Sequence, residues 1–187
     1  RGASACVYKG NYCDSNVAIK ILHPHFKHNH DFEREAAVLL TCSAPNIVTF
    51  FGICMFEEGV GMVTELCRTS LFHEIMDLRS QGIIFKEVKD KMVKIMVEII
   101  SGLSVLHAKG VMHGDLKPAN VLLDHSGTAK LADFGLSHVF GVGSLGKPET
   151  QDTGTTSLFG GQGLGTIGYM AIELMSPDIE ACSISLP

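Results

Sequence analysis

The stretch that decides the fold is His113-Gly114-Asp115-Leu116-Lys117-Pro118-Ala119-Asn120, followed further along by Asp133-Phe134-Gly135. Two short apolar runs, Val121 to Leu123 and Ala129 to Leu131, separate the two motifs. Runs of this length on either side of a polar segment, here residues 124–128, predict two strands joined by a turn. The sequence therefore predicts a β-turn-β unit that carries a polar motif at each end.

The side chains of these two motifs suit phosphoryl transfer. That reaction needs the phosphates clamped, a metal ion held and the acceptor hydroxyl oriented. Asp115 can accept or orient the hydroxyl proton, and Lys117 would lie near the transferring phosphate. Asn120 and Asp133 carry oxygens that Mg²⁺ binds. Each triplet is common by chance, but their order and spacing are highly specific.

A lysine and a glutamate nearer the start of the chain extend this pattern. Val17-Ala18-Ile19-Lys20 predicts a strand, and Glu35 lies on the helix predicted after it. A lysine fixed on a strand can reach nucleotide phosphates, and a helical carboxylate can hold its ammonium in place. A surface lysine with a solvated glutamate is the competing interpretation, and the strand-then-helix context leaves the two about even.

The first residues, Arg1-Gly2-Ala3-Ser4-Ala5-Cys6-Val7, match the end of a glycine-rich loop. Small residues allow backbone amides to approach phosphate oxygens closely. Ala5 stands where such a loop has its third glycine. By itself this segment favours an ordinary turn over a phosphate-binding loop.

Hydrophobic periodicity predicts a β-rich first part and a helical second part. The expected strands cover 6–10, 17–22, 47–55 and 62–66, with a polar turn over 11–16. Three helices are expected. The first begins with Asp31 as its N-cap, and the second covers 70–80. The third is a long helix with an apolar stripe from Met92 to Leu106, and Gly110 ends it. Residues 141–165 predict a mobile loop. This order indicates an α+β fold of two lobes with a hinge at 65–67.

Composition excludes several other classes of protein. The 187 residues carry a formal net charge of -5, which disfavours nucleic acid as a partner. No apolar stretch is long enough for a transmembrane segment, and no secretory signal opens the chain. Six cysteines without CxxC spacing predict reduced thiols in an intracellular protein. His23, His25, His28 and His30 predict a solvated loop rather than a metal site.

From Gly2 to Glu173 the chain resembles a eukaryotic protein kinase domain. The resemblance implies a small antiparallel-sheet lobe with one helix over residues 1–66, whose first strand is missing. It also implies a partial helical large lobe over residues 67–187, which lacks its later helices. ATP would bind between the lobes with two Mg²⁺ ions. Leu39, a residue near Phe50, His113 and Phe134 would stack into an internal spine.

The resemblance also implies a role for each site residue. Thr64 would be the gatekeeper beside the adenine, and Glu65 to Cys67 the hinge that hydrogen-bonds it. The full assignment gives catalytic roles to Asp115, Lys117, Lys20 and Glu35, nucleotide binding to Gly2, Ala5, Val7, Ala18, Lys20, Thr64, Glu65, Cys67 and Leu122, and metal binding to Asn120 and Asp133.

The expected substrate is a protein serine or threonine hydroxyl. Lys117-Pro118 is similar to serine/threonine kinases, and the Asp-Phe-Gly-Leu-Ser run is similar to the tyrosine-kinase-like group. A cytoplasmic location, or the cytoplasmic face of a membrane protein, follows from this reading. The alternative is a pseudokinase or a truncated scaffold that binds nucleotide without catalysis. A P-loop hydrolase is excluded because no Gly-Lys-Ser/Thr ends the glycine-rich stretch.

The chain departs from the family pattern at two positions. Gly114 replaces an arginine that usually pairs with a phosphate on the activation loop, which predicts activity without strict dependence on loop phosphorylation. Ile172 replaces the proline of the Ala-Pro-Glu motif. The hydroxyl residues of the long loop could be phosphorylated, but a disordered insertion is the favoured interpretation for all of them except Thr166. By the resemblance, Thr166 would lie where the substrate hydroxyl meets Asp115.

Overall fold

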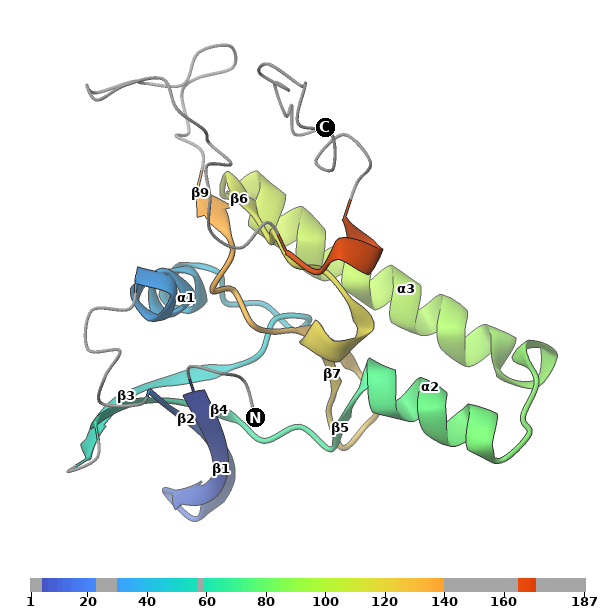
Figure 1. Cartoon of the computed structure of the whole chain (residues 1–187), viewed down its shortest axis with the longest axis horizontal. Helices are drawn as coiled ribbons and strands as arrows, with labels where there is room; N and C mark the ends of the chain where they lie inside the picture. Colours follow the sequence, from blue (N-terminus) through green and yellow to red (C-terminus); the bar gives the residue numbers. More distant parts are fainter. Residues whose placement is uncertain (1–4, 23–29, 57–58, 140–164, 171–187) are drawn as a thin grey trace, which may run out of the picture.

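The computed structural model describes residues 5–22, 30–56, 59–139 and 165–170 (Figure 1). Its first lobe contains β1 (Ala5–Tyr12), β2 (Ser15–Leu22), α1 (His30–Thr41), β3 (Phe50–Phe56) and β4 (Gly59–Glu65). The rest contains β5 (Thr69–Ser70), α2 (Leu71–Ser80), α3 (Phe85–Ala108), β6 (Val111–Met112), β7 (Val121–Leu123), β8 (Ala129–Leu131) and β9 (His138–Val139), with 3-10 turns at Pro118–Asn120 and Ile167–Tyr169. The order of elements confirms the predicted α+β class.

The first lobe is built on an antiparallel sheet with strand order β1-β2-β4-β3. β1 and β2 are longer than predicted, because the expected turn over 11–16 shrinks to Cys13 and Asp14. Both residues have positive φ, 47° and 61°, which is the backbone of a type I′ turn. Such a turn matches the right-handed twist of the strands and so lets the ladder continue to Tyr12 and Ser15.

Helix α1 lies beside this sheet and buries one apolar face (Figure 1). Its buried side chains are Phe32, Glu35, Ala36, Val38 and Leu39, the spacing of a single helical face. The prediction of Asp31 as N-cap is wrong, because the helix already includes His30. Asp31 lies instead in the first turn, where a negative charge favours the helix dipole.

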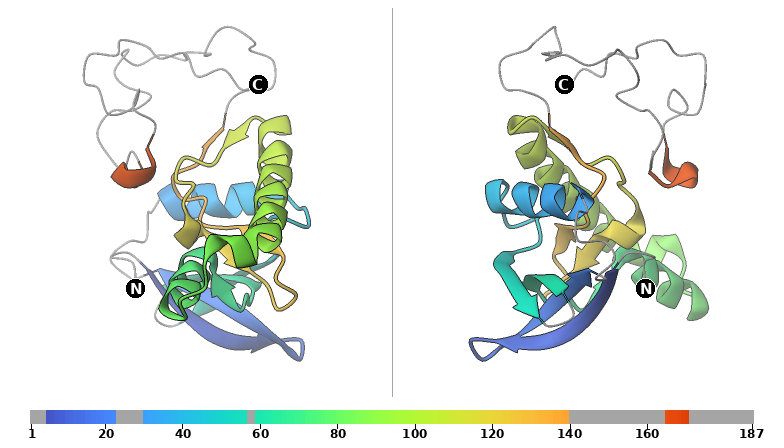
Figure 2. Two further views of the ribbon diagram at one scale, coloured as in Figure 1. Left: turned by 90° about the vertical axis from the view of Figure 1, so that its right-hand side faces the viewer. Right: turned by 60° about the vertical axis from the view of Figure 1, so that its left-hand side comes forward.

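Helices α2 and α3 form the other lobe, beyond the small sheet of β5, β7 and β8 (Figure 2). The Ser70 side chain caps α2 by accepting from the His73 amide at 3.3 Å. Helix α3 begins at Phe85, ahead of the apolar stripe that predicted it, and the Glu87 carboxylate accepts from the Ile84 amide at 3.2 Å. An N-terminal carboxylate of this kind stabilises the start of a helix.

Backbone contacts between residues 46–48 and β8 join the lobes. Ile47 was predicted to open a strand of the first sheet, but β3 begins only at Phe50. Ile47 instead forms a parallel bridge with Leu131, flanked by bonds from the Val48 amide to the Leu131 carbonyl and from the Leu131 amide to the Asn46 carbonyl, both 2.9 Å. These bonds fix the position of β8, and therefore of Asp133, relative to the first lobe.

One hydrophobic cluster extends through both lobes. It includes Leu22 and Phe32 of the first lobe, and Ile95, Leu106 and Leu131 of the second. Within the described ranges no helix has the length and apolar character needed to cross a membrane. The predicted loop 141–165, apart from Gly165, lies outside the described residues, as do Gly2, Ile172, Glu173 and three of the four clustered histidines.

Candidate active site

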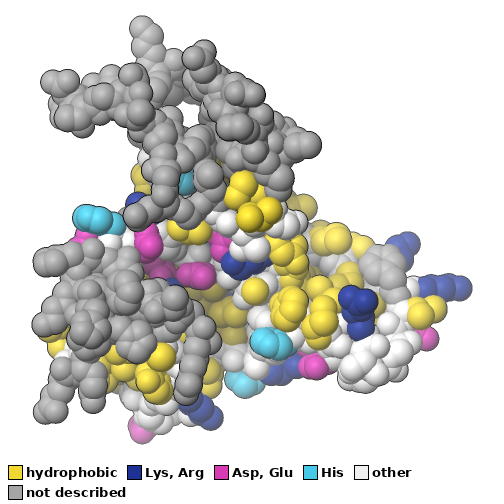
Figure 3. Space-filling model, viewed as in Figure 1, with side chains coloured by type: hydrophobic (Ala, Val, Ile, Leu, Met, Phe, Trp, Pro, Cys, Tyr) yellow, Lys and Arg dark blue, Asp and Glu magenta, His cyan; other side chains and the backbone are white. Residues whose placement is uncertain are grey.

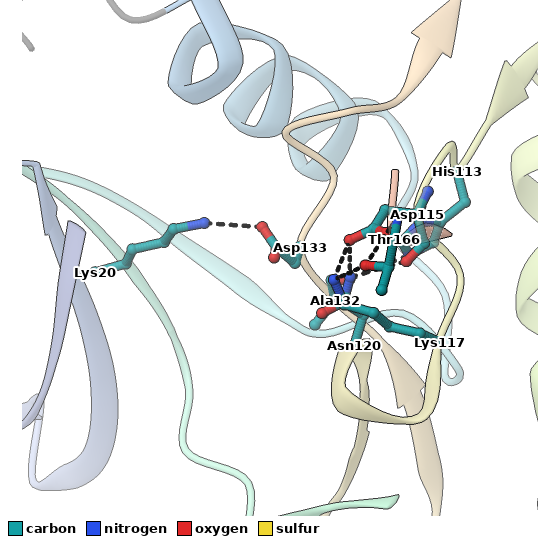
Figure 4. A network of polar contacts seen from close by, with 8 residues as sticks. All are labelled: Lys20, His113, Asp115, Lys117, Asn120, Ala132, Asp133 and Thr166. Atoms are coloured by element: carbon teal, nitrogen blue, oxygen red, sulfur yellow. Dashed lines mark hydrogen bonds and ion pairs between the residues drawn. The ribbon is translucent and has the colours of Figure 1, made fainter. Parts of the chain in front are cut away.

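Lys20, Glu35 and Asp133 come from three elements and form one ion-pair cluster. The Lys20 ammonium lies 2.6 Å from a Glu35 carboxylate oxygen. It also lies 3.1 Å from a carboxylate oxygen of Asp133 (Figure 4). Strand β2 supplies the lysine, the buried face of α1 the glutamate, and the segment after β8 the aspartate. The sequence left two interpretations about equal, an ion pair between this lysine and this glutamate or two separate solvated side chains. The structure shows the ion pair.

Charge and burial act in opposite directions within this cluster. Burial would lower the pKa of the Lys20 ammonium, but the carboxylates of Glu35 and Asp133 outweigh it and raise that pKa. Burial raises the pKa of Glu35, and the Lys20 charge only partly offsets it. Because its pKa is raised, Lys20 carries its positive charge at neutral pH, which phosphate binding would require.

Asp115, Lys117 and Thr166 form a second network. The Lys117 ammonium donates to Asp115 at 2.5 Å and to the Thr166 hydroxyl at 2.6 Å. Thr166 donates to Asp115 from its hydroxyl at 2.9 Å and from its amide at 2.8 Å. Burial would raise the pKa of Asp115, but these hydrogen bonds lower it. Asp115 is therefore an ionised acceptor, and Thr166 lies against it, as predicted.

The 3-10 turn Pro118–Asn120 returns Asn120 to Asp115. The Asn120 side-chain nitrogen donates to the Asp115 carbonyl at 2.8 Å and to its carboxylate at 3.0 Å. The Asn120 carbonyl accepts from the Ala132 amide at 3.0 Å, which places the turn against the residue before Asp133. Proline suits the start of such a turn because its φ is already fixed.

His113 fixes the other end of the same loop. Its Nε2 lies 3.1 Å from the Ala132 carbonyl, and its Nδ1 accepts from the Asp115 amide at 3.4 Å. Burial lowers the pKa of His113, so the ring is neutral with its proton on Nε2. The ring also lies 5.0 Å from that of Phe134. Leu39 and Phe134 belong to the same core cluster, with Phe50 packed against it, and the stacking of these residues into a spine stays a prediction.

Asn120 and Asp133 have the atoms that a magnesium ion would need. The Asn120 amide nitrogen is committed to Asp115, while its oxygen accepts no hydrogen bond from any described residue. Asp133 gives one oxygen to Lys20 and is half exposed. Within the described residues, no group of three or more His, Cys, Asp or Glu side chains is arranged so that it could hold a metal ion. Mg²⁺ takes few protein ligands and completes its shell with phosphate and water.

Four predicted nucleotide-binding residues share one face of the first sheet. Val7 pairs with Lys20 across β1 and β2, and Ala18 pairs with Thr64 across β2 and β4. Ala18 and Lys20 are two residues apart on one strand, so the side chains of all four point to the same side. Figure 3 shows acidic and basic side chains at the rim of a hollow between the lobes, with hydrophobic side chains deeper inside.

The remaining predicted nucleotide-binding residues lie at or beyond the edges of that face. Leu122 is half buried on β7, opposite in direction to the buried Val121 and Leu123. Ala5 is the first residue of β1, and Gly2 lies outside the described residues.

Burial raises the pKa of the Cys67 thiol to about 12, with Glu65 adding to the effect, so this cysteine is an inert thiol.

The hinge contains a polar network that the sequence did not predict. The Glu65 carboxylate accepts from the Thr49 amide at 2.6 Å, the Thr49 hydroxyl at 2.8 Å and the Lys130 ammonium at 2.9 Å. Lys130 also donates to the Pro45 carbonyl at 3.1 Å. The Glu65 side chain is thus used within the protein, and the Glu65 amide donates to the Thr49 carbonyl at 2.9 Å. Among described residues, the Cys67 amide has no hydrogen-bond partner.

Arg34 is a second residue that sequence reasoning missed. Its guanidinium donates to the Gly135 carbonyl at 2.9 Å and lies 3.5 Å from Asp31. It therefore ties α1 to the segment that carries Asp133. Its adjacency to Glu35 on the predicted helix was the only available signal, and an arginine on a helix is ordinarily a solvated charge.

Comparison with known proteins agrees with this geometry. The model of the family described as "Protein kinase domain" matches residues 1–181. The chain is similar to serine/threonine-protein kinase pakH of Dictyostelium discoideum, at 33% identity over 77% of this chain and 29% of the relative. It is similar to serine/threonine-protein kinase STY46 of Arabidopsis thaliana, at 34% identity over 74% of this chain and 24% of the relative. It is also similar to dual specificity protein kinase shkB of Dictyostelium discoideum, at 33% identity over 81% of this chain and 22% of the relative. The chain thus spans less than a third of the length of these relatives.

Proposed function

The chain belongs to the protein kinase domain family, and from this premise we propose that it transfers the γ-phosphoryl group of ATP to a serine or threonine hydroxyl of a protein. The arrangement of Thr166 carries the proposal. Its hydroxyl lies between the Asp115 carboxylate at 2.9 Å and the Lys117 ammonium at 2.6 Å. A threonine hydroxyl therefore fits between a base and a cation, which is the environment that an acceptor hydroxyl needs.

Each side chain of the site has a distinct part in this reaction. Asp115, ionised, orients the acceptor hydroxyl and takes its proton. Lys117 offsets the negative charge that develops on the transferring group. Lys20, held by Glu35, binds the nonreacting phosphates of the nucleotide. Asn120 and Asp133 would hold magnesium, which when bound supplies charge neutralisation across the phosphates.

The finer assignments belong to the same proposal. The Glu65–Cys67 backbone would bind adenine, with Val7, Ala18, Thr64 and Leu122 around it. Two of the similar proteins named above are serine/threonine-protein kinases and one is a dual specificity kinase. We place the chain with serine/threonine kinases because of Lys117-Pro118, and membership of the tyrosine-kinase-like group stays a prediction. A cytoplasmic location and the absence of nucleic-acid partners are likewise predictions.

The test has two steps. Binding of ATP is measured with and without Mg²⁺, and transfer of labelled γ-phosphate to a generic protein substrate is then followed. We expect magnesium-dependent binding in the wild type and in Asp115→Ala, with a transfer rate about 10²- to 10⁴-fold lower in the variant. Asp77→Ala, an exposed aspartate on α2, is the control and should behave as the wild type.

If Asp115→Ala transfers phosphate as fast as the wild type, the proposed reaction is wrong. Nucleotide binding with no transfer by either protein would identify the chain as a pseudokinase-like binding module.

A further inference from the structure

We propose that Glu74 of α2 positions the hinge for adenine binding through Arg68, the residue that directly follows the hinge. This inference rests on the proposed function, which assigns adenine to the backbone of residues 65–67. The Glu74 side chain binds Arg68 and Lys91, which have no part in the proposed reaction, so its role is positioning.

Glu74 is a buried carboxylate with a cationic partner on each oxygen. The Arg68 guanidinium donates to one oxygen at 2.8 Å, and the Lys91 ammonium of α3 donates to the other. Only 8% of Glu74 is exposed, a degree of burial that acidic side chains rarely reach unless they are paired. The hydrogen bonds from Lys91 and Arg68 lower the pKa of Glu74, so it is ionised at neutral pH. One carboxylate thus joins α2 to the end of the hinge and to α3.

Burial is unequal among the three partners, and this makes the arrangement testable. The side chains of Arg68 and Lys91 are 45% and 42% exposed, so water solvates both cations whether or not Glu74 is charged. Ion pairs with partners of this exposure add little to stability. A neutral side chain at residue 74 should therefore leave the protein folded while it releases Arg68.

Arg68 is held on two sides. Its amide donates to the Leu123 carbonyl of β7 at 2.9 Å, and its side chain binds Glu74 of α2. The residue before it, Cys67, has a backbone amide with no hydrogen-bond partner among the described residues. The free amide of the hinge therefore directly precedes a residue that both β7 and α2 fix in place.

The other end of the hinge has a comparable ion pair. The Glu65 carboxylate lies 2.9 Å from the Lys130 ammonium, which attaches that end to β8. Cys67 lies between this pair and the one formed by Arg68 and Glu74. Its amide thus has a defined position before any nucleotide arrives, and a donor that is already ordered binds without the entropic cost of ordering it. Loss of the Glu74 charge should add that cost to adenine binding.

Glu74→Gln is the variant that tests this role, and α2 supplies a matched control. Asp77 is exposed on the same helix, so Asp77→Asn removes the same charge without a comparable ion pair. Arg68→Ala breaks the same link from its exposed partner and serves as the test if Glu74→Gln does not fold. Lys91→Ala leaves the link between Glu74 and Arg68 intact.

The affinity of each protein is measured by calorimetric titration for adenosine, Mg-ATP and magnesium tripolyphosphate. We expect Glu74→Gln to bind adenosine and Mg-ATP about fivefold more weakly, because both ligands contain adenine and reordering a released side chain has a cost of this size. Tripolyphosphate has no adenine and should bind as it does to the wild type. Arg68→Ala should match Glu74→Gln, whereas Lys91→Ala and Asp77→Asn should change no affinity by more than about twofold.

The double variant of Glu74→Gln and Arg68→Ala should bind adenosine no more weakly than either single variant, since both changes break one link. The proposal is overturned if Glu74→Gln binds adenosine as the wild type does, or if its affinity for all three ligands falls together. A wild type that binds no adenosine would contradict the role given to the hinge, and with it this inference. A wild type that binds adenosine but transfers no phosphate would contradict the proposed reaction alone, and the adenosine titrations would still decide the role of Glu74.

Discussion

The two halves of the site are held together in different ways. The half proposed to bind nucleotide, here called the nucleotide side, contains Lys20, Glu35 and Asp133 and is assembled from β2, α1 and the segment after β8 through ion pairs of 2.6 and 3.1 Å. The half proposed to transfer phosphate, here called the transfer side, lies mostly within one loop, where the Asn120 side-chain amide donates to the Asp115 carbonyl at 2.8 Å. Long-range ion pairs depend on the position of whole elements, whereas a loop with local bonds depends on its own backbone.

This difference suggests where each half is sensitive. Movement of α1 would separate Glu35 from Lys20 without disturbing Asp115. A change in the backbone near Gly114 would move Asp115 without disturbing the Lys20 pair. Substitutions should therefore divide into those that change nucleotide affinity and those that change the rate of transfer.

The largest expected effect comes from the two lysines. Lys117→Ala should lower kcat about 100-fold or more with ATP affinity within about threefold, since Lys117 acts on charge that develops during transfer. Lys20→Ala should also weaken ATP binding, because its partners are ground-state phosphates. Steady-state kinetics with an ATP titration separates the two, and Lys109→Ala, after the end of α3, is the control. Equal changes in both variants would contradict the division.

A smaller effect is expected from the helix that supports Lys20. Glu35→Gln should weaken ATP binding about tenfold, because Lys20 keeps only Asp133 as a partner. The loss of affinity should be smaller than for a fully buried ion pair, because Lys20 is partly exposed. Glu33→Gln, on the exposed side of the same helix, is the matched control. Calorimetric titration with Mg-ATP measures both. Unchanged affinity in Glu35→Gln would show that α1 does not set the nucleotide side.

A substitution at Ser137 tests the segment that follows Asp133. Its hydroxyl is fully buried and has no hydrogen-bond partner in the described part of the chain. Ser137→Ala removes an unsatisfied polar group and should raise the free energy of unfolding by about 1 kcal/mol. Urea denaturation measures this, with Ser101→Ala on the exposed side of α3 as control. A destabilised Ser137→Ala would reveal a partner for the hydroxyl.

The smallest effects concern pH, where the halves differ in sign. Burial raises the pKa of Glu35 above its ordinary 4.5, while hydrogen bonds lower that of Asp115 below its ordinary 3.8 despite its burial. Asp115 therefore contributes stability that is present above about pH 3.8 and lost as the pH falls through its folded pKa. Glu35 contributes the reverse, stability that is lost as the pH rises through its folded pKa. A carboxyl-carbon NMR titration checks the order, and Glu35 titrating below Asp115 would contradict it.

Much of the fold was predictable because local patterns decide it. The strands of β7 and β8 have the predicted bounds, and the α2 cap, Ser70, is the residue that opened the predicted helix. Predictions failed where a contact with a distant segment, or an unusual backbone conformation, decides the structure. Ile47 leaves the first sheet to pair with Leu131, and two non-glycine residues at positive φ shorten the first turn.

The sequence by itself determined the residues of the candidate site, because the order and spacing of Lys20, Glu35, Asp115, Asn120 and Asp133 are highly specific. Only the tertiary structure decided how that set is held. In the sequence, Gly114 is notable because the arginine of the family pattern is absent. In three dimensions, its backbone packs closely against the Leu136 carbonyl. Glu65 reads as a hinge residue, but its side chain binds Thr49 and Lys130. Residue type follows from sequence, whereas steric contact and ion pairing between distant segments exist only after the chain has folded.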